Sequence, residues 1–175
     1  MFIKGFTYGF DGRRGMYQTP EAAASMERLA GLGGDWAALA FVIRQDHFYS
    51  TSIRPDYRYT VTDKDVTTAV NRLHAQGLKV CMKPMVNSAD GVWRAYIGFP
   101  EKDWGEQTEW TEWFDNYTSF LCHYAEIAEE TGCEMFCVGC EMLGTEHKVD
   151  FWRKTIAAVR QVYHGPLVYN TNHGK

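Results

Sequence analysis

The stretch that decides the fold of this chain reads Glu134-Met135-Phe136-Cys137-Val138-Gly139-Cys140-Glu141-Met142. Its apolar run, bounded by Gly132 and Gly139, predicts a buried strand of a parallel sheet. Glu141 comes at or just past the carboxyl end of this strand, which is where α/β enzymes place their catalytic residues. A carboxylate in this position is equally consistent with an ordinary ion pair to a neighbouring arginine.

Outward from this strand, apolar strands alternate with amphipathic helices along the whole chain. Strands are predicted at residues 3–10, 36–43, 79–85, 134–142 and 167–170. Helices are predicted between the N-cap Thr19 and Gly33, between the N-cap Thr62 and Gly77, from about Thr108 to Thr131, and from about Asp150 to Gly165. On the last of these helices, Trp152, Ile156, Val159 and Tyr163 are expected to face inward. Four strand–helix pairs followed by a fifth strand predict a parallel sheet with right-handed crossovers.

The long connections all follow strands. They cover residues 47–59, 86–107 and 142–148, whereas the turns after the helices are short. Long loops at the carboxyl edge of the sheet and short turns at the opposite edge are typical of (β/α) barrels and doubly wound sheets. No GxGxxG or GxxxxGK[ST] motif follows the first strand, so a nucleotide site would lack its usual phosphate-binding loop. The sequence therefore favours a TIM-type (β/α) barrel that acts on a non-phosphate substrate.

Composition narrows the functional classes. With 45% apolar and 23% charged residues, 1–175 is expected to form a single domain. The net charge of −4 and the lack of a basic stripe disfavour nucleic acid or an anionic membrane as partner. No signal-peptide pattern and no run of about 18 apolar residues occur, so a membrane location is not expected. Five cysteines without an export signal favour a reduced, cytoplasmic protein over a disulfide framework.

One candidate chemistry is a thiol or metal site. Cys133, Cys137 and Cys140 lie close together in the sequence, with His147 nearby. Residues three apart on a strand point to opposite faces, which is poor geometry for a shared metal or a redox pair. We therefore expect buried, reduced cysteines and no metal or other cofactor.

The other candidate chemistry is acid/base catalysis by Glu141. A carboxyl group among apolar and aromatic neighbours loses solvation, so its pKa would rise and it would serve as a general acid near neutral pH. Cleavage of a glycosidic bond needs such a group together with a second carboxylate. Asp46, Asp90 and Glu146 are available in the loops, and no spacing singles out one of them.

Several motifs occur in order at the predicted strand ends and in the helices. They are Val80–Asn87, Asp90–Ala95, Trp113–Tyr117, His123–Ala125, Phe136–Met142, Trp152–Arg153 and Val159–Arg160. Together they resemble glycoside hydrolase family 113, whose members are retaining (β/α)8-barrel enzymes, mainly endo-β-1,4-mannanases and often labelled 1,4-β-xylanase. The resemblance runs over essentially the whole chain.

This resemblance implies a role for each candidate residue. Glu141 would be the acid/base carboxyl at the end of the fourth strand. The sugar-binding cleft would be lined by Lys83, Asn87, Trp93, Arg94 and Asn170, although Lys83 and Arg94 are also consistent with ion pairing to Glu141. Cys140 stands where related barrel glycosidases have Asn, so the hydrogen bond from that Asn to a sugar hydroxyl is not expected here.

The family's nucleophile is a second Glu at the end of the seventh strand, so the resemblance implies that this chain is the N-terminal part of a barrel, supplying about the first five strands. We expect it to bind a β-linked oligosaccharide or polysaccharide, most closely β-mannan, and to be inactive alone. The open sheet edges would favour self-association. The alternatives are a non-catalytic carbohydrate-binding or assembly fragment and, less favoured, a cysteine-based redox or metal protein.

Overall fold

A computed structural model of the chain describes residues 3–101 and 105–172. Five strands form one parallel sheet in chain order: β1 (Gly5–Phe10), β2 (Trp36–Gln45), β3 (Lys79–Ser88), β4 (Met135–Cys140) and β5 (Leu167–Asn170). The helices are α1 (Pro20–Ala30), α2 (Asp63–Ala75), α3 (Thr108–Glu130) and α4 (Val149–Val162). Short 3-10 helices occur at Met16–Gln18, Arg94–Tyr96 and Leu143–Thr145. The predicted parallel strand order is confirmed.

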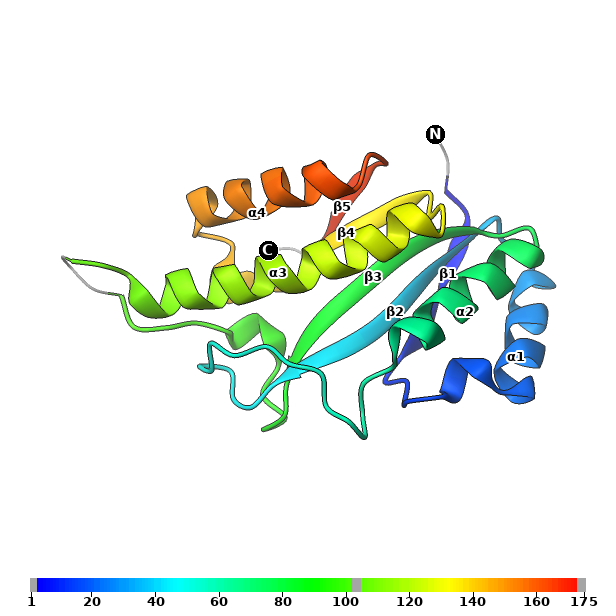
Figure 1. The fold of residues 1–175 in the computed structure, drawn as a ribbon, viewed down its shortest axis with the longest axis horizontal. Coiled ribbons are helices and arrows are strands. Elements are labelled where there is room, and N and C mark those ends of the chain that lie inside the picture. Colours follow the sequence, from blue (N-terminus) through cyan, green and yellow to red (C-terminus); the bar gives the residue numbers. More distant parts are fainter. Residues whose placement is uncertain (1–2, 102–104, 173–175) are drawn as a thin grey trace.

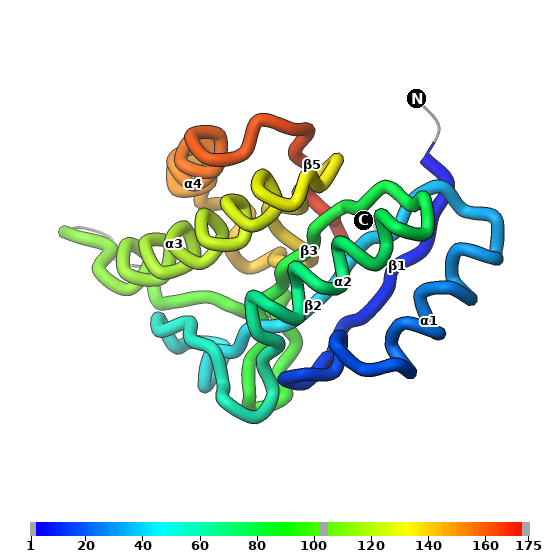
Figure 2. Tube along the Cα trace, turned by 45° about the vertical axis from the view of Figure 1, so that its right-hand side comes forward, coloured from blue at the N-terminus to red at the C-terminus, as the bar shows by residue number. Residues whose placement is uncertain are grey.

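The helices pack along one face of the sheet (Figures 1 and 2). On β2, the alternate residues Leu39, Phe41 and Ile43 belong to the main core under these helices. Ala40 and Val42 lie on the opposite face, where they form a second, smaller cluster with two other buried residues, Met85 and Cys140. The sheet therefore has a helix-covered face and a second face that carries its own side chains.

Local sequence explains the helix starts. Thr19 accepts a hydrogen bond from the Ala22 backbone and Pro20 opens α1, while Thr62 and Asp65 form a capping box at the start of α2. Helix α1 ends at Ala30 rather than near Gly33, because the chain turns over residues 31–33 and Gly33 takes a positive φ of 77°.

Further details differ from the sequence predictions. Strand β1 begins at Gly5, and β3 continues to Ser88, so Asn87 belongs to the strand and not to the loop. Ile156 on α4 was predicted to face inward and is 37% exposed. The reason is its position: α4 flanks the edge strand β5, and no element in the described part of the chain covers that side of the helix.

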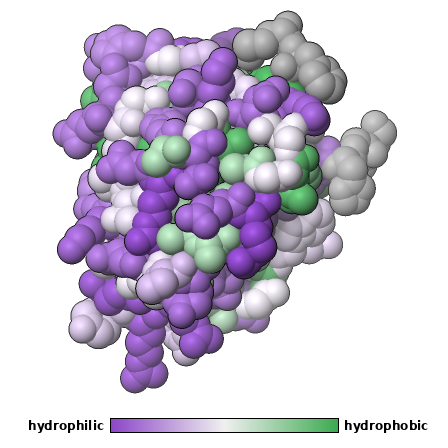
Figure 3. All heavy atoms as spheres, turned by 90° about the vertical axis from the view of Figure 1, so that its right-hand side faces the viewer, coloured by the Kyte–Doolittle hydropathy of each residue, from purple (hydrophilic) through white to green (hydrophobic). Residues whose placement is uncertain are grey.

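The molecular surface on the side of α1 and β1 is mainly hydrophilic, with apolar residues scattered among polar ones (Figure 3). Within the described ranges, none of the helices has the length and hydropathy that a membrane span requires. Part of the long loop predicted at 86–107, residues 102–104, lies outside the described residues.

Candidate active site

The candidate residues meet at the carboxyl edge of three neighbouring strands. Lys83 and Asn87 lie four residues apart on β3 and so share one face, Glu141 directly follows β4, and Asn170 ends β5. The Glu141 amide donates to the Asn170 carbonyl at 2.8 Å, and Lys83 Nζ donates to Asn170 Oδ1. Three of the predicted site residues are thereby connected across β3, β4 and β5.

Glu141 leaves the sheet in a strained conformation. Its φ is +54°, and within the described ranges Phe10, with φ of +119°, is the only other non-glycine residue with positive φ. A non-glycine residue in such a conformation costs on the order of 1–3 kcal/mol and is found most often at functional sites. At this residue the backbone turns from β4 toward the 3-10 helix at Leu143–Thr145.

Two side chains from the β3–α3 connection hold the carboxylate of Glu141. Arg94 Nη2 lies 3.3 Å from Oε2, and Trp93 Nε1 donates to the same oxygen at 3.4 Å. The Glu141 side chain is 28% exposed, so it remains open to a ligand. The ion pair that the sequence left open for Arg94 is thus present, whereas the charged group of Lys83 is bonded to Asn170.

Exposed aromatic rings lie next to Trp93 and Arg94, the two residues that hold the carboxylate. Trp93 is 43% exposed and Tyr96 is 65% exposed, with ring centroids 6.1 Å apart and the rings nearly perpendicular. Phe10, also exposed, lies at the end of β1 with its ring centroid 5.8 Å from Arg94 Cζ. Tyr96 and Phe10 were not among the predicted site residues. Two sequence features point to them: Tyr96 follows Trp93 in the same loop, and Phe10 stands at the end of the first strand.

The other loop carboxylates are occupied elsewhere. Asp46 pairs with Arg54 at 2.9 Å, and Glu146 accepts a hydrogen bond from the Tyr169 hydroxyl at 2.6 Å. The backbone amides of Val92 and Phe48, together with His47, hold the pKa of Asp90 below its ordinary value. The partners of these three carboxylates are thus different from Arg94 and Trp93, the partners of Glu141.

Three of the five cysteines, Cys133, Cys137 and Cys140, are buried, and Cys81 and Cys122 are partly buried. Burial raises the pKa of Cys81 to about 12 and that of Cys133 to about 11, and it also raises the pKa of Cys137. A protonated thiol is a poor nucleophile and a poor metal ligand. All five cysteines are free, and Cys137 is buried in the sheet as predicted. The described residues contain no group of three or more His, Cys, Asp or Glu that would hold a metal ion.

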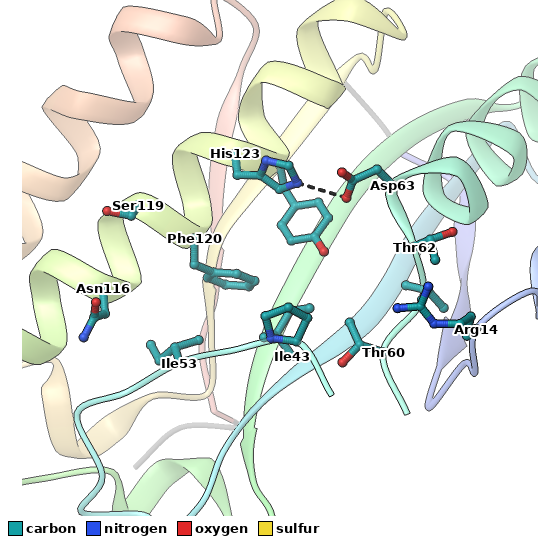
Figure 4. Close-up of a pocket in the computed structure, with 13 residues that line it drawn as sticks. Arg14, Ile43, Ile53, Thr60, Thr62, Asp63, Asn116, Ser119, Phe120 and His123 are labelled. Atoms are coloured by element: carbon teal, nitrogen blue, oxygen red, sulfur yellow. Dashed lines mark hydrogen bonds and ion pairs between the residues drawn. The ribbon is translucent and has the colours of Figure 1, made fainter. Parts of the chain in front are cut away.

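A separate pocket of about 580 Å³ lies between α3 and the β2–α2 connection (Figure 4). Ile43, Ile53 and Phe120 form part of its apolar wall, and at one end His123 Nε2 contacts Asp63 Oδ1 at 2.9 Å. None of the candidate site residues lines it. The site at the carboxyl edge of the sheet therefore does not include this pocket.

The family model of Glycoside Hydrolase Family 113 matches residues 6–175. The chain belongs to this family. A solved structure of the GH113 β-mannanase AaManA from Alicyclobacillus acidocaldarius, in complex with ManMIm, is 46% identical with a TM-score of 0.93, covering 99% of this chain and 55% of that one. A second GH113 β-1,4-mannanase is 41% identical with a TM-score of 0.90, covering 97% of this chain and 55% of that one.

More distant structures share the fold alone. The exo-β-1,4-mannosidase Op5Man5 from Opitutaceae bacterium strain TAV5 is 13% identical with a TM-score of 0.53, covering 91% of this chain and 30% of that one. No match was found among curated proteins. The sheet of this GH113 chain corresponds to part of the (β/α)8 barrel, and the chain spans about half the length of the GH113 mannanases that it matches.

Proposed function

We propose that this chain carries the acid/base half of a retaining GH113 glycosidase that cleaves β-1,4-linked mannan. The observation that carries the proposal is the position of Glu141: a half-open carboxylate at the carboxyl end of β4, beside exposed aromatic rings. The family match and the mannanase neighbours favour β-mannan as the substrate class.

In the proposed mechanism, Glu141 acts twice. It first protonates the glycosidic oxygen while a second carboxylate attacks the anomeric carbon, and it then takes a proton from the water that releases the sugar from the covalent intermediate. We place the second carboxylate in the part of a GH113 barrel that this chain does not span. The chain by itself is then unable to follow the retaining route.

The neighbouring side chains supply contacts for the sugar. The exposed faces of Trp93 and Tyr96 suit the apolar face of a pyranose ring. Lys83 has three N–H donors and Asn170 uses one, while Asn87 accepts from Arg94 through Oδ1 and keeps its NH2 group for a sugar hydroxyl.

The test is a chimaera in which residues 6–175 replace the matching region of AaManA. We expect it to release reducing sugar from soluble β-mannan with retention of anomeric configuration, and we expect the 175-residue chain alone to release none. An inverted product would contradict the mechanism. Turnover by the chain alone would mean that the nucleophile has been misplaced. A folded chimaera that binds mannan without turnover would favour the alternative of a non-catalytic carbohydrate-binding protein.

We also propose a cytoplasmic location, because all five cysteines are free and such thiols persist in a reducing compartment. Fractionation of the source cells tests this directly, and recovery of the protein outside the cytoplasm would contradict it.

A further inference from the structure

Arg94 is too deeply buried to act as an ordinary sugar ligand. The residue is 7% exposed, and its guanidinium group is enclosed by protein atoms. Nη1 donates to Asn87 Oδ1 at 2.9 Å, and Nη2 lies 3.8 Å from Met85 Sδ and 4.0 Å from Cys140 Sγ. These contacts hold the guanidinium group between Asn87 and two buried side chains, Met85 and Cys140.

A buried guanidinium cation needs a negative partner, because removing its charge from water is unfavourable. Glu141 supplies it: Nη2 is 3.3 Å from Oε2, the oxygen that also accepts the Trp93 indole N–H. Within residues 3–101 and 105–172, Glu141 Oε1 has no hydrogen-bond or ion-pair partner. The two carboxylate oxygens of Glu141 therefore differ: Oε2 is bound by Arg94 and Trp93, and Oε1 is available to a ligand.

The same guanidinium group contacts both of the strained non-glycine residues in the described ranges. Its Cζ is 5.8 Å from the centroid of the Phe10 ring, and its Nη2 pairs with Glu141. Phe10 and Glu141 are the two positive-φ residues other than glycine in the described ranges. Strain of this kind persists only where the surroundings enforce one conformation, and Arg94 is a contact that both residues share.

We propose that Arg94 is a positioning residue that holds Glu141 Oε2, so that Oε1 is the oxygen that carries the catalytic proton. This inference rests on the proposed function. In the first step the proton passes from Oε1 to the glycosidic oxygen as the bond from that oxygen to the anomeric carbon breaks and the second carboxylate bonds to that carbon. In the second step Oε1 accepts a proton from water as the water oxygen bonds to the anomeric carbon and the bond from that carbon to the second carboxylate breaks. Arg94 itself touches no sugar.

Kinetics of Arg94→Met in the chimaera separate positioning from sugar binding. On mannooligosaccharides we expect kcat to fall about 10²-fold, the effect of a misplaced catalytic group, with KM within about twofold of the parent value. A dinitrophenyl β-mannoside needs no protonation of its leaving group, so its first step should lose less than about tenfold. A raised KM with equal loss on both substrates would make Arg94 a substrate ligand and overturn the proposal.

Two further variants complete the set. Arg94→Lys keeps the charge but not the planar fork of donors, so its kcat should lie between those of Arg94→Met and the parent. It also keeps the test open if Arg94→Met does not fold. The matched control is Arg153→Met, because Arg153 is 76% exposed and, among the residues that the structure describes, its ion pair is with Asp150 on the same helix. Its kinetics should equal those of the parent, and a loss as large as that of Arg94→Met would contradict the proposal.

A readout on the 175-residue chain needs no activity. The Trp93 indole N–H donates to Glu141 Oε2, so its NMR resonance reports the position of that carboxylate. We expect Arg94→Met to shift this resonance while the other indole signals stay in place. An unshifted Trp93 signal in a folded variant would contradict the proposal that Arg94 positions the Glu141 carboxylate. If the chimaera is inactive but the resonance shifts, the proposed function fails and the positioning contact stands.

Discussion

Replacement of Asp65 by Ala is predicted to destabilise the chain far more than replacement of its neighbour Asp63. Asp65 is fully buried and accepts hydrogen bonds from the Gly15 amide (2.9 Å), Gln18 Nε2 (2.9 Å) and both the amide (2.8 Å) and hydroxyl (2.7 Å) of Thr62. These bonds join the β1–α1 connection to the start of α2. The carboxylate is thus both a helix cap and a tertiary link.

The size of the effect follows from these contacts. Loss of a helix cap costs about 0.5–2 kcal/mol, and leaving a buried donor without a partner costs about 1–3 kcal/mol. Because water reaches part of the Gly15 and Gln18 donors, we expect Asp65→Ala to cost about 2–4 kcal/mol in all. Asp63 is 60% exposed and pairs with His123, so Asp63→Ala should cost about 0.2–1 kcal/mol.

The effect of Asp65 also has a defined pH dependence. Burial raises the pKa of Asp65, but the hydrogen bonds from Gln18, Gly15 and Thr62 outweigh burial and hold it below the ordinary value. The contribution to stability is therefore complete above about pH 4, the pKa of an unfolded Asp, and is lost as the pH falls through the lower pKa of the folded state.

Urea unfolding of the parent, Asp65→Ala and Asp63→Ala measures both effects. The difference between parent and Asp65→Ala should be the same at pH 7 and pH 5 and should shrink in more acidic buffer. Equal unfolding free energies for the two variants, or a difference that grows on acidification, would refute the reasoning.

Three further predictions follow from other parts of the fold. A Cβ atom at Gly139 would lie 2.6 Å from Tyr169 Cε2 and 2.9 Å from Trp152 Cη2, so Gly139→Ala should lower the unfolding free energy by about 1–3 kcal/mol; an unchanged urea midpoint would contradict this. In a thiol-reagent titration, five thiols should react after unfolding and the buried Cys133 and Cys137 should react slowly before it; fewer than five would indicate a disulfide. β1 and β5 are the two edges of the described sheet, and free edges favour pairing with another chain, so light scattering should give a mass above that of a monomer; a monodisperse monomer would refute the edge argument.

Much of the fold could be predicted because its signals are local. Strand and helix positions follow from apolar periodicity, and the starts of α1 and α2 follow from Thr19, Pro20 and Thr62. The exposure of Ile156 could not be predicted, because helical periodicity shows which residues share a face and not whether a neighbour covers that face.

The candidate site was predicted in outline and not in its contacts. Parallel strands bring their carboxyl ends to one edge, so grouping Lys83 and Asn87 with Glu141 needed only the order of strands. The partners of each side chain depend on register and on the path of the β3–α3 connection. Two contacts could therefore not be predicted. One is the Lys83–Asn170 contact across β4, and the other is the binding of Arg94 and Trp93 to the same oxygen of Glu141, Oε2.

The central claim, that Glu141 is the acid/base residue, is tested most directly by Glu141→Gln in the chimaera with residues 6–175. On mannooligosaccharides, whose leaving groups need a proton, we predict a loss of about 10²–10⁴-fold, the usual contribution of general acid catalysis. The first step on a dinitrophenyl β-mannoside should be nearly unchanged, and Glu146→Gln, at a carboxylate bonded to Tyr169, should behave as the parent. Equal loss by Glu141→Gln on both substrates, or no loss on either, would contradict the account.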